Sequence, residues 1–101
     1  MVPYAVFTHP PLGRTGEMTG ELLEFDVAKN AAAQAERADV GRVWIAHENG
    51  TVRGAAVHAP HGAELAQFLT PFVAAGLTID LLRDLLTVHP TFTEALQSAA
   101  L

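Results

Sequence analysis

The stretch RVWIAHENGTVRGAAVHA, residues 42–59, decides the fold of this 101-residue chain. Two runs rich in β-forming residues flank Asn49-Gly50. Both residues of that dipeptide tolerate the positive φ angles that the centre of a type I′ turn requires, so the stretch predicts a β-hairpin. A two-residue turn also predicts the register of the two strands, with the cross-strand pairs Glu48–Thr51, Trp44–Ala55 and Val43–Ala56.

Two further strands are predicted before the hairpin. Residues 2–8, VPYAVFT, are β-branched and aromatic, and Pro3 confines this strand to an edge or places the proline at its start. Residues 21–27, ELLEFDV, alternate apolar and acidic side chains, which predicts a strand with one solvent-exposed face. The prolines and glycines of residues 9–20 predict an irregular connection, and Asn30 is a candidate cap for a short helix over residues 31–37.

Helices are predicted after the hairpin. Apolar residues at helical spacing predict one helix, whose stripe is Leu65, Phe68, Leu69, Phe72 and Val73. Gly76 is a candidate left-handed stop, and Pro71 predicts a kink, or a break in which Thr70 caps a new turn. Thr78 is the expected N-cap of a second helix in LTIDLLRDLL, and a last helix is expected from about Thr91 to the end. Paired strands followed by gathered helices predict a single α+β domain rather than a parallel α/β fold.

Composition narrows the function classes. The formal net charge is −5, and the six Lys and Arg residues do not cluster, so we expect no nucleic-acid partner. The chain has no cysteine and therefore no disulfide, thiolate metal site or redox thiol of its own. Half of its residues are hydrophobic, so we expect an exposed apolar patch that marks an interface.

No targeting or membrane segment is evident from the sequence. The N-terminus has no basic region followed by a long apolar run. The longest apolar stretch, residues 65–79, is interrupted by polar and helix-breaking residues and falls short of the roughly 20 residues that a membrane-spanning helix needs. We expect a soluble, cytoplasmic chain.

The segment TVHPTFTEAL, residues 87–96, has two interpretations. In the first, Thr91 and Glu94 form a capping box at the start of the last helix, and His89 is a loop residue. In the second, the Glu94 carboxylate lies beside His89, fixes its tautomer and raises its pKa, so that the other ring nitrogen acts as a general acid or base. A carboxylate has two oxygens, so the two interpretations are compatible.

HPTFTEAL resembles the closing signature of the pyridine nucleotide-disulfide oxidoreductases, the flavoprotein disulfide reductases that include dihydrolipoamide dehydrogenase, glutathione reductase and mercuric reductase. The likeness continues upstream. Residues 50–82, GTVRGAAVHAPHGAELAQFLTPFVAAGLTIDLL, resemble the hairpin, interface helix and following helix of that family, and residues 2–16 resemble the opening of its C-terminal dimerisation domain. The likeness departs at residues 17–40, where a helix of the family is shortened, at His9, where an acidic residue is common, and at Pro71.

The resemblance implies an antiparallel sheet with helices packed on one face. It implies that residues 1–101 are one dimerisation domain, excised from a longer flavoprotein, and that the protein is a homodimer. In that dimer His89 is the general acid/base at the partner subunit's thiol–disulfide site, Glu94 orients it, and His89 and Pro90 lie near the flavin. FAD and NAD(P)H bind to other domains of the parent enzyme.

The sequence itself holds no G-x-G-x-x-G motif and no cysteine pair, so the chain alone is expected to bind no cofactor and to be inactive. The alternative is a free-standing homodimerisation module that keeps the fold without the chemistry. His58 and His61 with Glu64 could suggest a metal, but a structural zinc site needs four fixed ligands, and we expect no metal site. His9 and His47 are expected to be surface or loop residues.

Overall fold

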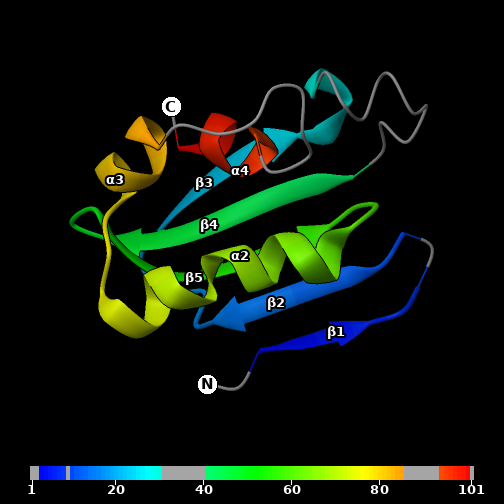
Figure 1. The fold of residues 1–101 in the computed structure, drawn as a ribbon, viewed down its shortest axis with the longest axis horizontal. Helices are drawn as coiled ribbons and strands as arrows, with labels where there is room; N and C mark the ends of the chain where they lie inside the picture. The colour runs from blue at the N-terminus through cyan, green and yellow to red at the C-terminus, as the bar shows by residue number, and fades with distance from the viewer. Residues whose placement is uncertain (1–2, 9, 31–40, 86–93, 101) are drawn as a thin grey trace.

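The computed structural model describes residues 3–8, 10–30, 41–85 and 94–100, with the side chains of residues 94 and 95 outside that description (Figure 1). Its elements are β1 (Tyr4–Val6), β2 (Leu12–Gly16), β3 (Glu21–Asp26), the 3-10 turn η1 (Val27–Lys29), β4 (Arg42–Glu48), β5 (Thr51–His58), α2 (Gly62–Ala75), α3 (Ile79–Asp84) and α4 (Glu94–Ala99).

The strands form a five-stranded sheet of order β1-β2-β5-β4-β3, and every neighbouring pair is antiparallel. Figure 1 shows α2, α3 and α4 on the same face of this sheet. The predicted α+β class, with helices packed on one face of an antiparallel sheet, is confirmed. None of the described helices is long and apolar enough to cross a membrane.

β2 lies inside the segment that the sequence predicted to be irregular, so that prediction was wrong for residues 12–16. The reason is a close approach of α2. A Cβ atom on Gly13 would lie 2.2 Å from the Gly62 carbonyl oxygen, and one on Gly62 would lie 2.7 Å from the Val57 carbonyl oxygen. Gly13 therefore lets the start of α2 rest on the sheet, and it does not mark a turn.

The hairpin turn is confirmed, but the register beyond it is not. Asn49 and Gly50 have φ angles of 49° and 85°, and Glu48 pairs with Thr51. A β-bulge then leaves Arg53 without a partner on β4, so the observed pairs are Trp44–Ala56 and Val43–Val57 rather than the predicted ones. The Arg53 carbonyl accepts a hydrogen bond from the Glu17 N–H at 3.0 Å. The chain just after β2, far from Arg53 in sequence, is therefore bonded to the bulge.

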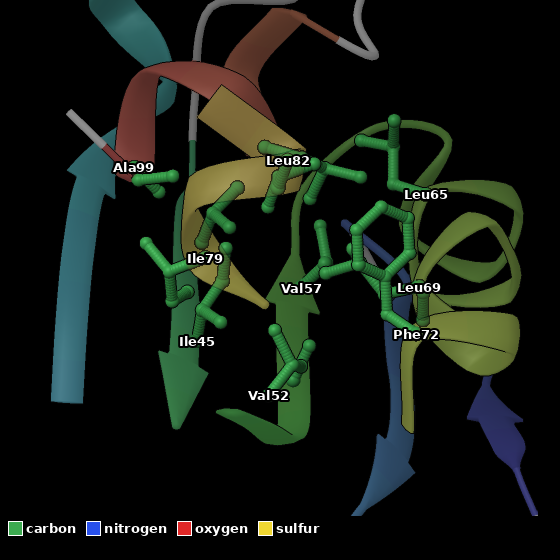
Figure 2. Close-up of a cluster of buried hydrophobic side chains, with 14 of the residues drawn as sticks. Ile45, Val52, Val57, Leu65, Leu69, Phe72, Ile79, Leu82 and Ala99 are labelled. Carbon is green, nitrogen blue, oxygen red and sulfur yellow. The ribbon is translucent and has the colours of Figure 1, made fainter. Parts of the chain in front are cut away.

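The core lies between the sheet and the helices. Figure 2 shows sheet residues facing the helices, and the labelled side chains are Ile45, Val52, Val57, Leu65, Leu69, Phe72, Ile79, Leu82 and Ala99. The predicted stripe of α2 is confirmed: Leu65, Leu69 and Phe72 are buried and Val73 is half-buried, while Phe68 is 37% exposed at the edge of the contact.

α2 continues through Pro71, so the predicted break at Thr70 does not occur. The Thr70 hydroxyl instead donates to the Ala66 carbonyl at 3.4 Å, inside the same helix. The helix ends at Gly76, whose φ of 63° confirms the left-handed stop. Thr78 then caps α3 as predicted, because its hydroxyl accepts the Leu81 N–H at 3.1 Å.

The remaining predicted elements lie partly outside the described residues. The strand predicted over residues 2–8 is shorter, and the strand predicted over residues 21–27 is confirmed apart from Val27, which begins η1. Asn30 ends η1 and is 4% exposed, while the helix predicted over residues 31–37 lies outside the described residues. The last helix is observed as α4, and its expected start at Thr91 also lies outside them.

Candidate functional site

The predicted proton relay lies mostly outside the described residues. His89, Pro90 and Thr91 are not described, and Glu94 is described as the first residue of α4 without its side chain. The observable part of this site is therefore the framework on both sides of residues 86–93, formed by the end of α3 and by α4.

Two polar side chains join α3 to α4. The Gln97 amide donates to the Arg83 carbonyl at 3.0 Å and also to the Leu85 carbonyl. In return, the Arg83 Nε donates to the Ala100 carbonyl at 3.1 Å, while its guanidinium pairs with Asp80 at 2.8 Å. These bonds satisfy carbonyls that helix ends leave without intrahelical partners. We call Arg83 and Gln97, with the carbonyls that they bind, the α3–α4 clamp.

Burial anchors the clamp to the sheet. Leu96 is fully buried, Ala99 is 4% exposed, and Leu82 of α3 is 1% exposed. All three belong to the main core cluster, and α4 lies over β3 and β4 in Figure 1. The chain just before residue 86 and the chain just after residue 93 are therefore held on one rigid framework. Sequence reasoning missed this clamp, because an Arg and a Gln fourteen residues apart give no local signal.

His47, which lies outside that segment, makes contacts that support the fold. His47 belongs to β4 and its side chain is 13% exposed, so its expected place on the surface or in a loop was wrong. Its Nδ1 accepts the Gly50 N–H at 3.1 Å, and its Nε2 lies 3.7 Å from the Glu21 carboxylate. Because Nδ1 accepts this hydrogen bond, the neutral ring carries its proton on Nε2. The bond to the Gly50 N–H joins the His47 side chain to the hairpin turn. His9 lies outside the described residues.

The two histidines that the sequence raised as candidate metal ligands lie at the end of β5 and at the start of α2. His58 ends β5 and is exposed, while His61 is the N-cap residue of α2 with a φ of 62° and lies 3.6 Å from the Glu64 carboxylate. Across the described ranges, no group of three His, Cys, Asp or Glu side chains could hold a metal ion. A cavity of about 210 Å³ between β1 and α2 is smaller than the roughly 300 Å³ of typical ligand pockets.

The face of the sheet opposite the helices, which we call the outer face, carries two rows of side chains that cross all five strands. The pairing registers and the alternation of strand side chains define the rows as Tyr4–Arg14–Ala56–Trp44–Glu24 and Val6–Leu12–His58–Arg42–Asp26. Near β3 this face is charged, because Arg42 lies 2.6 Å from Glu24 and 3.9 Å from Asp26. At its other end this face carries Tyr4 and Val6 on β1, beside Arg14 and Leu12 on β2. No described helix packs on it (Figure 1).

Comparison with known proteins places this fold in a family. The family model of the pyridine nucleotide-disulphide oxidoreductase dimerisation domain matches residues 2–100. The chain belongs to this family. A curated relative, the dihydrolipoyl dehydrogenase of Haloferax volcanii, is 31% identical over 110 residues that cover 98% of this chain and 23% of the relative.

Solved structures support the same assignment to the dimerisation-domain family. The HOCl-induced flavoprotein disulfide reductase RclA of Escherichia coli, solved as its Cu(II) complex, is 26% identical with a TM-score of 0.87, over 96% of this chain and 25% of that one. LpdA of Mycobacterium tuberculosis shares the fold, with a TM-score of 0.86 at 24% identity over 98% of this chain and 24% of that one. The chain thus spans about a quarter of the length of these relatives.

Proposed function

We propose that this dimerisation domain belongs to an FAD- and NAD(P)H-dependent disulfide oxidoreductase that works as a homodimer. The observation that carries the proposal is the family match over residues 2–100, which includes the segment HPTFTEAL. A site assembled across a two-fold axis also accounts for how one small domain can hold part of an active site.

In this proposal His89 moves a proton at the thiol–disulfide site of the partner subunit. Its imidazole takes the proton of the attacking thiol, which leaves a thiolate nucleophile, and later returns that proton to the departing thiolate. Glu94 holds the imidazole in the tautomer and orientation that this exchange needs. The α3–α4 clamp supports the idea, because it fixes the described chain on both sides of residues 86–93.

The cofactors are assigned to other domains of the parent enzyme. The described sheet is wholly antiparallel, and a dinucleotide-binding fold needs parallel strands with a glycine-rich turn before a helix. The described residues therefore do not fit a dinucleotide cofactor. These 101 residues include no cysteine, so the exchanging thiols of the proposed enzyme come from outside them.

The test uses the parent enzyme, with His89→Ala as the variant and thiol–disulfide exchange as the readout. General acid–base groups contribute about 100- to 10,000-fold, so we expect a loss of that size with flavin content unchanged. His61→Asn is the matched control, because it removes an exposed histidine at a left-handed position that asparagine tolerates. An undiminished exchange rate in His89→Ala would remove His89 from the mechanism.

The second candidate function is a free-standing homodimerisation module that keeps the family fold without the chemistry. The gene sequence around Met1 separates the two functions. Upstream nucleotide-binding domains with a cysteine pair in the same reading frame support the reductase, and a true start codon at Met1 supports the module.

A further inference from the structure

The tip of the β4–β5 hairpin combines an exposed asparagine with a glycine that follows it. Asn49 and Gly50 have φ angles of 49° and 85°, and Asn49 is exposed to solvent. Among the described residues, no group is hydrogen-bonded to the Asn49 side-chain amide. A Cβ atom on Gly50 would meet no heavy atom within 4 Å, so open space surrounds this part of the turn. The tip therefore has room to rotate until the Asn49 side chain meets the Gly50 nitrogen.

A histidine lies against the same glycine nitrogen. The Nδ1 atom of His47 accepts the Gly50 N–H at 3.1 Å, and the His47 Nε2 lies 3.7 Å from the Glu21 carboxylate. Carboxylate, imidazole and N–H thus follow one another, which is an order that orients an imidazole as a general base and stabilises its protonated form. The Glu21 side chain is 81% exposed, so its contribution is smaller than that of the imidazole.

We propose that Asn49 is a site of spontaneous covalent modification, in which His47 is the base that activates the Gly50 nitrogen. This nitrogen gives its proton to the His47 Nδ1 and forms a bond to the Cγ atom of Asn49. The bond from Cγ to Nδ2 breaks, and ammonia leaves with the proton that the imidazole returns. Water then opens the resulting five-membered succinimide ring at one of its two carbonyls. The products are aspartate and isoaspartate at position 49.

The other asparagine of the chain lacks these features. Asn30 is 4% exposed, so water reaches it poorly. It is followed by Ala31, and an alanine nitrogen is more hindered than a glycine nitrogen because its residue carries a Cβ atom. Asn30 therefore serves as a reference inside the same molecule, and we expect the modification at Asn49 alone.

The modification would disturb the contact between the hairpin and α3 (Figure 1). The Gly50 carbonyl accepts the Ile79 N–H at 2.8 Å, and the Leu77 carbonyl accepts the Val52 N–H at 2.9 Å. Isoaspartate adds one carbon to the backbone of a two-residue turn, whose length fixes how the flanking strands meet. The Gly50 carbonyl would then leave its place opposite the first N–H of α3. The inference is independent of the proposed function, and it gives the domain a slow, irreversible change of its own.

The first experiment incubates the full chain at neutral pH, well below its melting temperature, and follows both asparagines by mass spectrometry. Trypsin cleaves after lysine and arginine, so it releases Asn49 within residues 43–53 and Asn30 within residues 30–37. Fragmentation of the first peptide locates the change and distinguishes aspartate from isoaspartate. We expect conversion at Asn49 and none at Asn30 over the same period. Equal conversion of the two would overturn the proposal.

His47→Gln separates the base from the hydrogen-bond acceptor. Glutamine offers an amide oxygen that can accept the Gly50 N–H, but it takes up no proton at neutral pH. General bases supply about 100-fold or more in active sites, and this turn is open to water, so we expect at least a roughly tenfold slowing. A loosened turn would have the opposite effect, because a freer Asn49 reaches the nitrogen more often. His58→Gln is the matched control, because it removes an exposed histidine at the far end of β5, and its rate should equal that of the wild type.

Unfolding provides a second comparison, because only the fold holds His47 against the Gly50 nitrogen. In concentrated urea the wild type and His47→Gln should convert Asn49 at the same rate, whereas in native buffer the wild type should be faster. Equal native rates for the wild type and folded His47→Gln would overturn the role of His47. An Asn49 that stays intact in the native chain while it converts in urea would overturn the whole proposal, because the closed turn would then protect it.

Thermal melting tests the effect on the contact with α3. The isoaspartate form, separated from the unmodified chain by ion exchange, should melt about 4–8 °C lower, the shift expected for roughly one lost hydrogen bond. Asn49→Asp is the control, because it adds the charge without lengthening the backbone, and it should melt close to the wild type. An isoaspartate form with the wild-type Tm would overturn the effect on the contact with α3.

A second variant keeps the test of the base decisive if His47→Gln fails to fold by circular dichroism. His47→Asn then takes its place, because its shorter amide also accepts a hydrogen bond without acting as a base. Fragmentation distinguishes the new asparagine from Asn49 within residues 43–53. A slower conversion of Asn49 in folded His47→Asn supports the proposal, and an unchanged rate overturns the role of His47.

Discussion

Replacing Gln97 with leucine should loosen the junction between α3 and α4. The substitution keeps the length and helix propensity of the side chain but removes both bonds of its amide, to the carbonyls of Arg83 and Leu85. A typical intramolecular hydrogen bond contributes about 0.5–1.5 kcal/mol net. Both bonds are at least partly exposed, so in the variant water can hydrogen-bond to the two carbonyls in place of the amide. We therefore expect a loss of about 1–2 kcal/mol in the free energy of unfolding.

For a domain of this size each kcal/mol lowers Tm by about 4–8 °C, so the Gln97→Leu variant should melt about 4–16 °C below the wild type. Circular dichroism and urea unfolding measure this, and the m-value should stay unchanged if only the folded state is affected. Gln67→Leu on the exposed side of α2 is the matched control and should stay within about 0.5 kcal/mol of the wild type. Equal stabilities for the two variants would refute the clamp as a stabilising contact.

Three further substitutions test the packing. Gly13→Ala should destabilise the domain by about 1–3 kcal/mol, because its Cβ would meet the Gly62 carbonyl at 2.2 Å; wild-type stability in urea would show that α2 can move away freely. Leu69→Ala, at a fully buried position between α2 and the sheet, should cost about 2–5 kcal/mol, and a loss below about 1 kcal/mol would contradict the core described here. Thr78→Ala should cost about 0.5–2 kcal/mol by removing the cap at the Leu81 N–H, whereas Thr78→Ser should retain most of the stability.

Local signals predicted much of this fold. Asn49-Gly50, the stripe of α2, the stop at Gly76 and the cap at Thr78 each depend on neighbours within a few residues, and all four are observed. The α+β class followed from the order of strands and helices alone.

The errors arose where residues far apart in sequence decide the structure. β2 is held between β1 and β5 while Gly13 meets Gly62 of α2, and the bulge at Arg53 sits where the backbone of Glu17 crosses Gly54. The α3–α4 clamp joins residues fourteen apart, and the outer face exists only when five strands are aligned. The spacing within residues 87–96 raised His89 and Glu94 as candidates but left a capping box open as the explanation of Glu94, and the resemblance to the family favoured the proton relay.

Substitution of Glu94 tests the central claim most directly, because glutamine preserves one of its two roles. Gln can replace Glu in a capping box, but it carries no charge to favour a protonated imidazole. In the parent enzyme the account predicts that Glu94→Gln slows thiol–disulfide exchange and moves the pH dependence of that exchange to lower pH, while Tm stays near the wild-type value. Glu94→Ala should lose both rate and stability. A Glu94→Gln enzyme with the rate and pH profile of the wild type would contradict the proton relay and leave Glu94 as a helix cap.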